Sequence, residues 1–189
     1  MIIKVCGMRE PQNIREVAAL AINWIGFIFY ERSKRFVERC PTEQQATDSE
    51  QLSPKKVGVF VNATIESMME KASAYKLDYL QLHGNESPED CHTLQKRGYS
   101  LIKAFPIATK EDFEKTREYE GRVDYFLFDT RCEGYGGSGK RFDWSILTEY
   151  EGETPFLLSG GIRPETRGGD PELPASPFRR YRPQQWLRD

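Results

Sequence analysis

Reactive and polar side chains stand at the ends of short apolar segments, where they can face a bound substrate. Cys6 follows the apolar, β-branched run Met1–Val5, and Asp129 closes the apolar run YFLFDT, residues 125–130. A thiol in such a place can act as a base or nucleophile, and a carboxylic acid can donate a proton. Each residue also has an ordinary structural interpretation: a small buried hydrophobe for Cys6, and a turn former or helix cap for Asp129.

Other segment ends carry groups that suit an anionic or polar ligand. Gln81 lies near the end of the run 79–82, and His83 follows that run directly. Three cations follow the apolar run 24–29: Arg32, Lys34 and Arg35. The cations fit either an anionic substrate group or a solvated loop. His83 fits either a ligand contact or a histidine that is hydrogen-bonded locally.

Glycines supply a further candidate binding element. Gly160 and Gly161 end the run PFLLSGG and come just before a helix start at 163–165. Backbone N–H groups at a helix N-terminus bind phosphate, so this turn predicts a phosphate site. The glycine-rich stretch 134–139 is a weaker signal for a loop whose backbone N–H groups approach an anion.

Alternating strand and helix patterns must position these groups. Seven strand-length apolar segments are expected at 1–5, 24–29, 57–61, 79–82, 101–107, 125–130 and 155–161. Helices are expected at 10–20, 41–52, 65–76, from Ser87 onward and at 110–119, with Asn62 or Thr64 capping the third of them. The alternation predicts an α/β fold with a parallel sheet, and the count favours a (β/α)8 TIM barrel whose eighth β/α unit is missing.

Composition limits the class of protein. The 189 residues are expected to form one domain, and 27 basic against 29 acidic residues give a net charge of −2, which argues against a general nucleic-acid binder. We expect no membrane span and no signal peptide. The four cysteines are far apart without a C-x-x-C pair, which predicts neither a zinc site nor a disulfide framework. A cytoplasmic enzyme is the interpretation that follows.

The tail differs in composition from the rest of the chain. Residues 167–189 contain no Val, Ile or Met, while Pro171, Pro174, Pro177 and Pro183 interrupt any long helix or strand. We therefore divide the chain into a barrel at 1–166 and an aberrant, disordered tail at 167–189. A genuine disordered tail is one explanation, and a shifted reading frame after Thr166 is the other.

The shifted frame restores the missing pieces. With permitted synonymous codons, RGGDPELPASPFRRYRPQQWLRD can be re-read as AEAIRSFRHPRFAGIDLNSGFE. That string contains a helix-like segment, a strand-like segment and a glycine-containing loop, which are the elements that the barrel lacks. We therefore favour the frameshift.

Taken together, the motifs resemble those of the phosphoribosylanthranilate isomerase family of tryptophan biosynthesis. The carrying stretches, in order, are KVCGMR, GFIF followed by SKRFV, VGVFVN, LQLHG, IKAFPI, FLFDT, GGSGKRFDW and LLSGGI. The resemblance covers 1–166 and implies a (β/α)8 barrel that catalyses the Amadori rearrangement of N-(5-phosphoribosyl)anthranilate. It implies no cofactor and no metal.

The resemblance also implies residue roles. Cys6 matches the family's general base and Asp129 its general acid, while Arg35 is expected to bind the anthranilate carboxylate through a forked contact. Gln81 and His83 are expected to contact the substrate. Gly160 and Gly161 match one half of the phosphate site, and the re-read loop NSGFE matches the other.

Several alternatives stay open from the sequence. An open, truncated barrel with unpaired edges on its first and seventh strands would be weakly active or would at most bind a phosphorylated ligand. Indole-glycerol-phosphate synthase and ribulose-phosphate epimerase are rival barrels, but the catalytic lysine–glutamate pair or metal ligands that they need are not evident. The expected partner is a small phosphorylated substrate, with no nucleic acid and no membrane, for a monomer or a homodimer.

Overall fold

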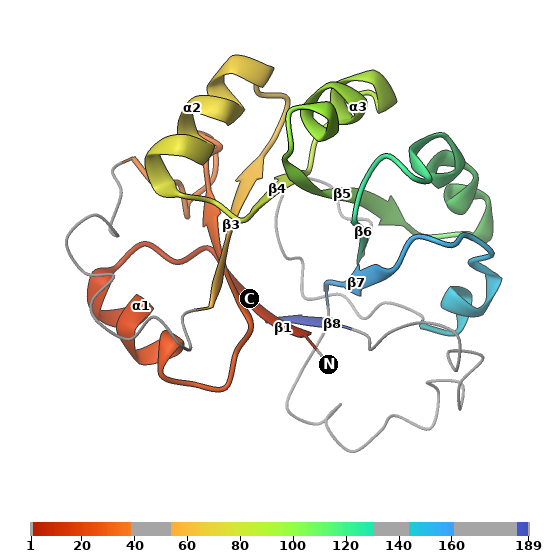
Figure 1. Cartoon of the computed structure of the whole chain (residues 1–189). Coiled ribbons are helices and arrows are strands. Elements are labelled where there is room, and N and C mark those ends of the chain that lie inside the picture. The colour runs from red at the N-terminus through yellow and green to blue at the C-terminus, as the bar shows by residue number, and fades with distance from the viewer. Residues whose placement is uncertain (1, 39–53, 131–143, 161–184, 189) are drawn as a thin grey trace.

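Eight parallel strands form the centre of the molecule. The computed structural model describes residues 2–38, 54–130, 144–160 and 185–188. Neighbouring strands pair in chain order and close into a barrel (Figure 1). The strands are β1 (Ile2–Cys6), β2 (Trp24–Ile28), β3 (Lys55–Phe60), β4 (Tyr79–Leu82), β5 (Ser100–Ile107), β6 (Tyr125–Thr130), β7 (Phe156–Leu158) and β8 (Gln185–Arg188). The predicted α/β barrel is confirmed.

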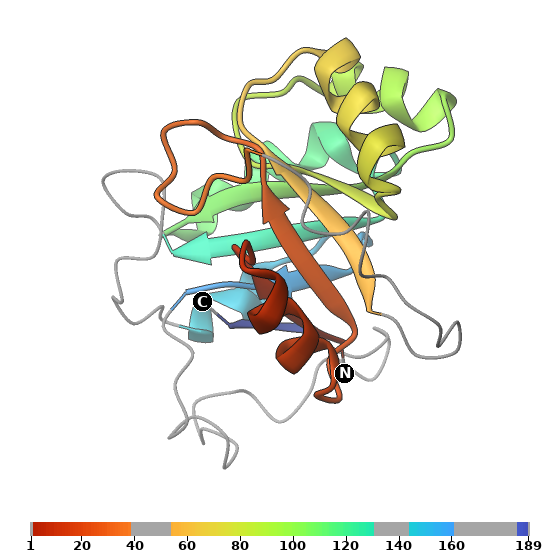
Figure 2. The ribbon, with the colours of Figure 1, turned by 90° about the vertical axis from the view of Figure 1, so that its left-hand side faces the viewer.

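Helices lie outside the ring of strands (Figures 1 and 2). They are α1 (Pro11–Ala18), α2 (Ile65–Tyr75), α3 (Pro88–Lys96) and two 3-10 helices, η1 (Lys110–Tyr119) and η2 (Trp144–Glu149). In the described part of the chain no helix follows β2, β7 or β8. The helices predicted at 41–52 and from 163 fall outside the described residues.

Local side-chain chemistry starts two of these helices where the sequence predicts. Of the two candidate caps for α2, Thr64 is the one used, because its side chain accepts a hydrogen bond of 3.2 Å from the Ser67 backbone N–H. At α3, Ser87 and Asp90 form a reciprocal capping box. These bonds satisfy donors that a helix N-terminus otherwise leaves unpaired.

The prediction of unpaired edges on the first and seventh strands is wrong. Residues Gln185–Arg188 of the tail pair with four residues of β1 and two of β7, which closes the ring. The physical reason is that edge strands present free backbone N–H and C=O groups, which a short extended segment can satisfy whatever its side chains are. Residues 167–184, assigned above to a disordered tail, fall outside the described residues.

Alternating residues of the strands face either the barrel lumen or the helices. A cluster of buried apolar side chains, joined by partly buried Ile2, Tyr79 and Tyr125, fills the lumen: Trp24, Val57, Ile102, Ala104, Leu127 and Leu157. Larger apolar clusters pack the outer faces of the strands against the helices. The core therefore consists of a filled lumen and an outer layer between the strands and the helices.

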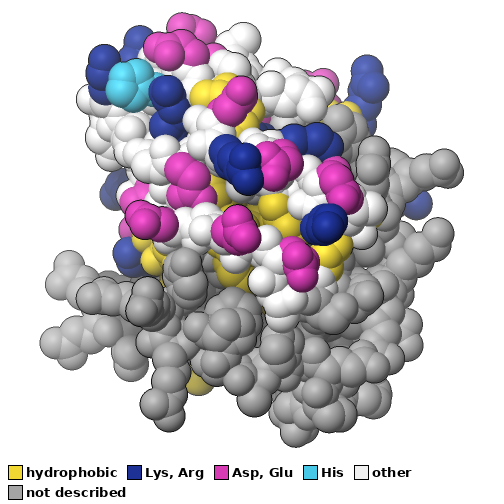
Figure 3. Space-filling model, turned by 90° about the vertical axis from the view of Figure 1, so that its right-hand side faces the viewer, with side chains coloured by type: hydrophobic (Ala, Val, Ile, Leu, Met, Phe, Trp, Pro, Cys, Tyr) yellow, Lys and Arg dark blue, Asp and Glu magenta, His cyan; other side chains and the backbone are white. Residues whose placement is uncertain are grey.

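The described surface in Figure 3 carries interspersed charges of both signs. Opposite charges also pair on η1, where Lys115 lies 2.9 Å from Asp112 and Arg117 lies 2.7 Å from Glu114. The described part of this face shows no continuous basic stripe of the kind that nucleic-acid binding requires. None of the described helices is long and apolar enough to cross a membrane.

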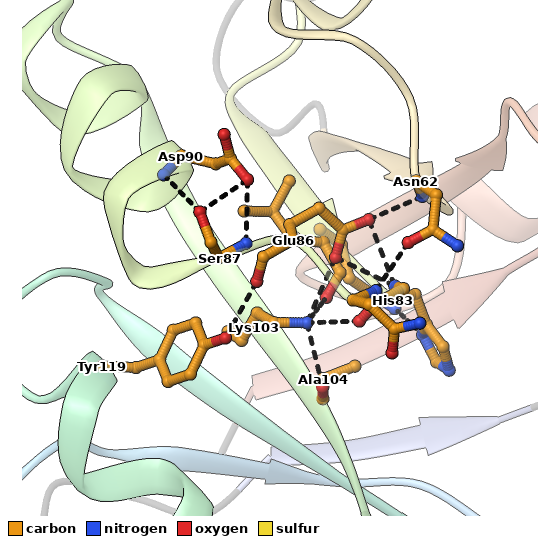
Figure 4. A network of polar contacts seen from close by, with 12 residues as sticks. Asn62, His83, Glu86, Ser87, Asp90, Lys103, Ala104 and Tyr119 are labelled. Carbon is orange, nitrogen blue, oxygen red and sulfur yellow. Dashed lines mark hydrogen bonds and ion pairs between the residues drawn. The ribbon is translucent and has the colours of Figure 1, made fainter.

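A buried ion pair links β5 to the loop that follows β4 (Figure 4). Lys103 Nζ lies 3.1 Å from Glu86 Oε2, and the two side chains are only 2% and 3% exposed. Lys103 also donates to the backbone carbonyls of Leu82 and Gly84, at 3.2 and 2.7 Å. Glu86 accepts from the Asn62 backbone N–H at 2.8 Å. The pair therefore fixes the backbone on both sides of position 83.

Removing one charge of this pair is expected to destabilise the fold. In Glu86→Gln, the ammonium of Lys103 stays buried without its counter-ion, and such losses cost about 3 kcal/mol or more. Glu114→Gln is the matched control, because Glu114 is 59% exposed and a surface ion pair contributes at most about 1 kcal/mol. Urea unfolding followed by circular dichroism gives both values, and equal losses in the two variants would contradict this account.

Candidate active site

The predicted acid and base lie at the same end of the barrel. Cys6 is the last residue of β1, Asp129 is the penultimate residue of β6, and His83 directly follows β4. Because all strands are parallel, their carboxyl ends form one mouth, which is where barrel enzymes hold their reactive groups. A thiol, a carboxyl group and an imidazole therefore share that mouth.

Arg35 lies beside Cys6 because Gly7 leaves room for it. Gly7 has φ +86°, a conformation that favours glycine, and a Cβ there would lie 2.6 Å from Arg35 Cδ. The guanidinium Nη1 donates to the backbone carbonyl of Cys6 at 3.4 Å. The strand-end turn thus positions the predicted carboxylate-binding arginine next to the predicted base.

His83 connects the strand β4 to Asp129. Its Nε2 lies 3.6 Å from Asp129 Oδ2, and both side chains are about one-quarter exposed (27% each). Its Nδ1 lies 2.8 Å from Gln81 Nε2. Apart from this contact, the loop around His83 is held by the Glu86–Lys103 pair (Figure 4). The imidazole is therefore held on one side and faces the carboxyl group on the other.

Gln81, which is predicted to contact the substrate, lies inside the barrel beside His83. Its side chain is buried at 3% exposure. Its amide oxygen accepts from Lys4 Nζ and its amide nitrogen lies against His83. With both ends of the amide engaged inside the barrel, Gln81 lies beneath the mouth rather than in it.

Lys4 is the residue of the site that sequence reasoning missed. It is fully buried, it is hydrogen-bonded to Gln81, and its side chain lies with that of Cys6 against Gly26. Burial lowers the pKa of Lys4, and the neighbouring Cys6 opposes that shift. The signal was its position two residues before Cys6, because residues i and i+2 of a strand share a face.

The two described cysteines have different environments. Cys6 is partly exposed at the mouth, whereas Cys91 is buried on α3. Burial raises the pKa of Cys91 to about 12, so this thiol stays protonated and unreactive. Cys40 and Cys132 fall outside the described residues. Among the described residues, no group of three or more His, Cys, Asp or Glu side chains is arranged to hold a metal ion.

The predicted phosphate turn is described in part. Gly160 follows β7 with φ +92°, a conformation that favours glycine. Gly161 and the glycine-rich stretch 134–139 fall outside the described residues. The turn after β7 is therefore at the same mouth as Cys6, with its second glycine still a prediction.

A lysine–glutamate pair of the kind that the rival barrels need is present but unsuited to catalysis. Lys103 and Glu86 are almost fully buried, and each has its hydrogen-bonding capacity used by the partner and by backbone groups. A substrate in the mouth would not reach either group, so this pair supports the fold.

The fold and the mouth together define a (β/α)8-barrel enzyme. The model of the N-(5'-phosphoribosyl)anthranilate (PRA) isomerase family matches residues 3–167. A relative from Parabacteroides distasonis named N-(5'-phosphoribosyl)anthranilate isomerase is 98% identical over 165 residues, which cover 87% of this chain and 75% of the relative.

Solved structures give the same result. The crystal structure of phosphoribosyl anthranilate isomerase from Thermotoga maritima has a TM-score of 0.78 at 30% identity, covering 99% of this chain and 87% of that one. A second isomerase structure, in complex with reduced 1-(o-carboxyphenylamino)-1-deoxyribulose 5-phosphate, has a TM-score of 0.78 at 27% identity, covering 100% of this chain and 87% of that one. The chain belongs to the N-(5'-phosphoribosyl)anthranilate isomerase family.

Gly26 of β2 is expected to be essential for placing Cys6. A Cβ at this position would lie 2.6 Å from Cys6 Sγ and 3.0 Å from Lys4 Cε. Gly26→Ala must therefore displace the thiol, and a shift of about 1 Å in a reacting group can cost about 10²-fold in rate. Steady-state kinetics per folded molecule measures the loss of kcat.

Gly58→Ala on the adjacent strand is the matched control. A Cβ there would meet Leu77 Cδ1 at 2.4 Å, in the layer between strands and helices. Overpacking of that kind costs about 1–3 kcal/mol of stability but leaves Cys6 in place. Equal loss of kcat in both variants would show that the effect of Gly26→Ala is general misfolding.

Proposed function

We propose that this isomerase converts N-(5-phosphoribosyl)anthranilate into 1-(2-carboxyphenylamino)-1-deoxyribulose 5-phosphate in tryptophan biosynthesis, with Asp129 as general acid and Cys6 as general base. The observation that carries the proposal is a carboxyl group and a thiol at the ends of β6 and β1, on one mouth of a closed barrel. No cofactor is needed, because each step is a proton transfer.

The first step opens the sugar ring. Asp129 donates its proton to the ring oxygen, the bond between that oxygen and C1 breaks, and the lone pair of the anthranilate nitrogen forms a C=N bond to C1. The three residues of β6 before Asp129, which are Phe126, Leu127 and Phe128, are buried. Asp129 is left as a carboxylate, and the substrate as a cationic Schiff base.

The second step moves a proton from carbon to sulfur. Cys6 as a thiolate removes the proton from C2, and the electron pair of that bond forms a C1=C2 double bond while the nitrogen is neutralised. Protonation at C1 and loss of the proton from the C2 hydroxyl then give the ketone. Cys6 finishes as a thiol and Asp129 as a carboxylate, so one proton must return before the next turnover.

Binding is assigned to groups around the reacting carbons. Arg35, beside Cys6, is proposed to hold the anthranilate carboxylate, since guanidinium and carboxylate form paired charge-assisted bonds. The turn at Gly160 and Gly161 is proposed to hold the phosphate. The enzyme is proposed to work in the cytoplasm as a monomer or a homodimer. A barrel that only binds a phosphorylated ligand has less support, because both reacting groups are at the mouth.

Cys6→Ala and Asp129→Asn are each expected to lower kcat by about 10²- to 10⁴-fold with a much smaller change in KM, since each removes a proton transfer and little binding. Turnover of purified variants at saturating substrate measures this. Near-normal kcat in either variant would remove that residue from its role.

Two control variants separate chemistry from folding. Cys91→Ala removes a thiol that lies outside the mouth, on α3. Asp124→Asn changes a carboxylate at the other end of β6, where it accepts a hydrogen bond from the Leu101 backbone N–H at 2.7 Å. Both controls are expected to keep kcat within about twofold of the unmodified chain, since neither group touches the reacting atoms.

We further propose that residues 1–166 are the isomerase barrel and that 167–189 are encoded in a shifted frame. Support comes from the family match, which ends at residue 167, and from the 98% identity to the Parabacteroides distasonis protein, which covers 75% of that relative. On this proposal, the tail segment β8 pairs with β1 and β7 in the place that the eighth strand of the unshifted frame would take.

The coding DNA from Gly160 to the stop codon tests this proposal. The shifted frame is expected to encode a helix, a strand and the glycine-containing loop of the re-read string. A shifted frame that encodes none of these would establish the tail as genuine.

A further inference from the structure

A chain of buried polar side chains crosses the barrel lumen between β1 and β4. Lys4 is fully buried and donates to Gln81 Oε1, and Gln81 itself is 3% exposed. The two residues are 77 positions apart in the sequence. The rest of the lumen is mainly apolar, and a buried ammonium group in such surroundings is costly unless acceptors surround it.

One end of this chain is the proposed base. Lys4 and Cys6 share a face of β1, and both side chains lie against Gly26, where a Cβ would meet Cys6 Sγ at 2.6 Å and Lys4 Cε at 3.0 Å. A cation beside a thiol favours its thiolate form, and a thiolate beside a buried ammonium offsets the cost of burying that charge. A second described cation near Cys6 is Arg35, whose Nη1 donates to the Cys6 backbone carbonyl.

The other end is the proposed acid, and the direction of every bond follows from the ammonium. Lys4 Nζ donates to the oxygen of the Gln81 amide, so the NH2 group of that amide faces His83. An NH2 group is a donor, so His83 Nδ1 accepts at 2.8 Å, and the neutral imidazole carries its proton on Nε2. That N–H faces Asp129 Oδ2 at 3.6 Å.

We propose that Lys4 and Gln81 are positioning residues that couple the base to the acid: Lys4 holds Cys6 as a thiolate, and through Gln81 it sets His83 to donate to Asp129. The other oxygen of Asp129 then carries the proton for the substrate. As that proton leaves, the His83 Nε2–H bond to the new carboxylate shortens, in the way that catalytic hydrogen bonds tighten along a reaction.

The inference rests on the proposed roles of Cys6 and Asp129, so its first test does not depend on turnover. The chain contains two histidines, His83 and His92, and a His92→Gln variant identifies the His83 signal in ¹⁵N NMR spectra. The neutral His83 ring is expected to be protonated at Nε2. A ring protonated at Nδ1 would overturn the proposal, whatever the activity of the enzyme.

The second test removes the ammonium. Lys4→Met keeps the length and apolar stem of the side chain, and kcat/KM at neutral pH is expected to fall about tenfold or more. The pH at which iodoacetamide alkylates Cys6 at half its maximal rate, measured by mass spectrometry, is expected to rise by about one unit, because the thiolate loses its neighbouring cation. Gln81→Met is expected to move the alkylation midpoint less but to abolish the single His83 tautomer.

Lys103→Met is the matched control, because it also removes a buried ammonium but at the Glu86 pair outside the lumen. It is expected to lower stability and to leave the midpoint of Cys6 alkylation unchanged. A folded Lys4→Met protein with the unmodified midpoint and kcat/KM would overturn the proposal. Loss of turnover in Cys6→Ala with no effect of Lys4→Met would leave the catalytic assignment standing and reject the coupling alone.

Discussion

The barrel is held together by backbone hydrogen bonds between strands that all run in one direction. Because β1 to β8 pair in chain order and the ring closes, every strand delivers its carboxyl end to the same mouth. Cys6, His83 and Asp129 come from positions far apart in the chain, and only this constraint brings them together. A parallel ring also leaves no edge, which explains why even a short tail segment such as Gln185–Arg188 is paired on both sides.

Two pairs of buried polar side chains contact the loop after β4. In the lumen, Lys4 and Gln81 approach His83 from below. In the layer between strands and helices, Lys103 and Glu86 bond the backbone at Leu82 and Gly84, on either side of the histidine. Both are built on a buried lysine whose charge has to be met by acceptors. The need to satisfy these charges thus leaves the His83 side chain with little freedom.

Much of this arrangement could be predicted from local patterns. Apolar runs mark the first seven strands, Thr64 and Ser87 mark two helix starts, and a polar residue after an apolar run marks the mouth. The catalytic assignments came from motifs in combination, since Cys6 or Asp129 alone has a commoner structural explanation.

Long-range contacts could not be predicted in the same way. The hydrogen bond between Lys4 and Gln81 joins β1 to β4, which are not neighbours in the sheet. The residues next to Lys4 and next to Gln81 give no indication of this bond. β8 was missed because its pairing is made by backbone groups, which carry no side-chain signature. The contact of Gln81 with the substrate stays a prediction, whereas its burial between Lys4 and His83 is a long-range feature that the sequence did not indicate.

The most direct test of the account is the turnover of N-(5-phosphoribosyl)anthranilate by the purified 189-residue chain, with product identified by mass spectrometry and folding checked by circular dichroism. The account predicts formation of the 1-deoxyribulose product faster than the uncatalysed reaction, with no added metal or cofactor. A cooperatively folded chain that forms no product above the uncatalysed rate would contradict it, because the proposed acid and base at the mouth would then be insufficient for the reaction.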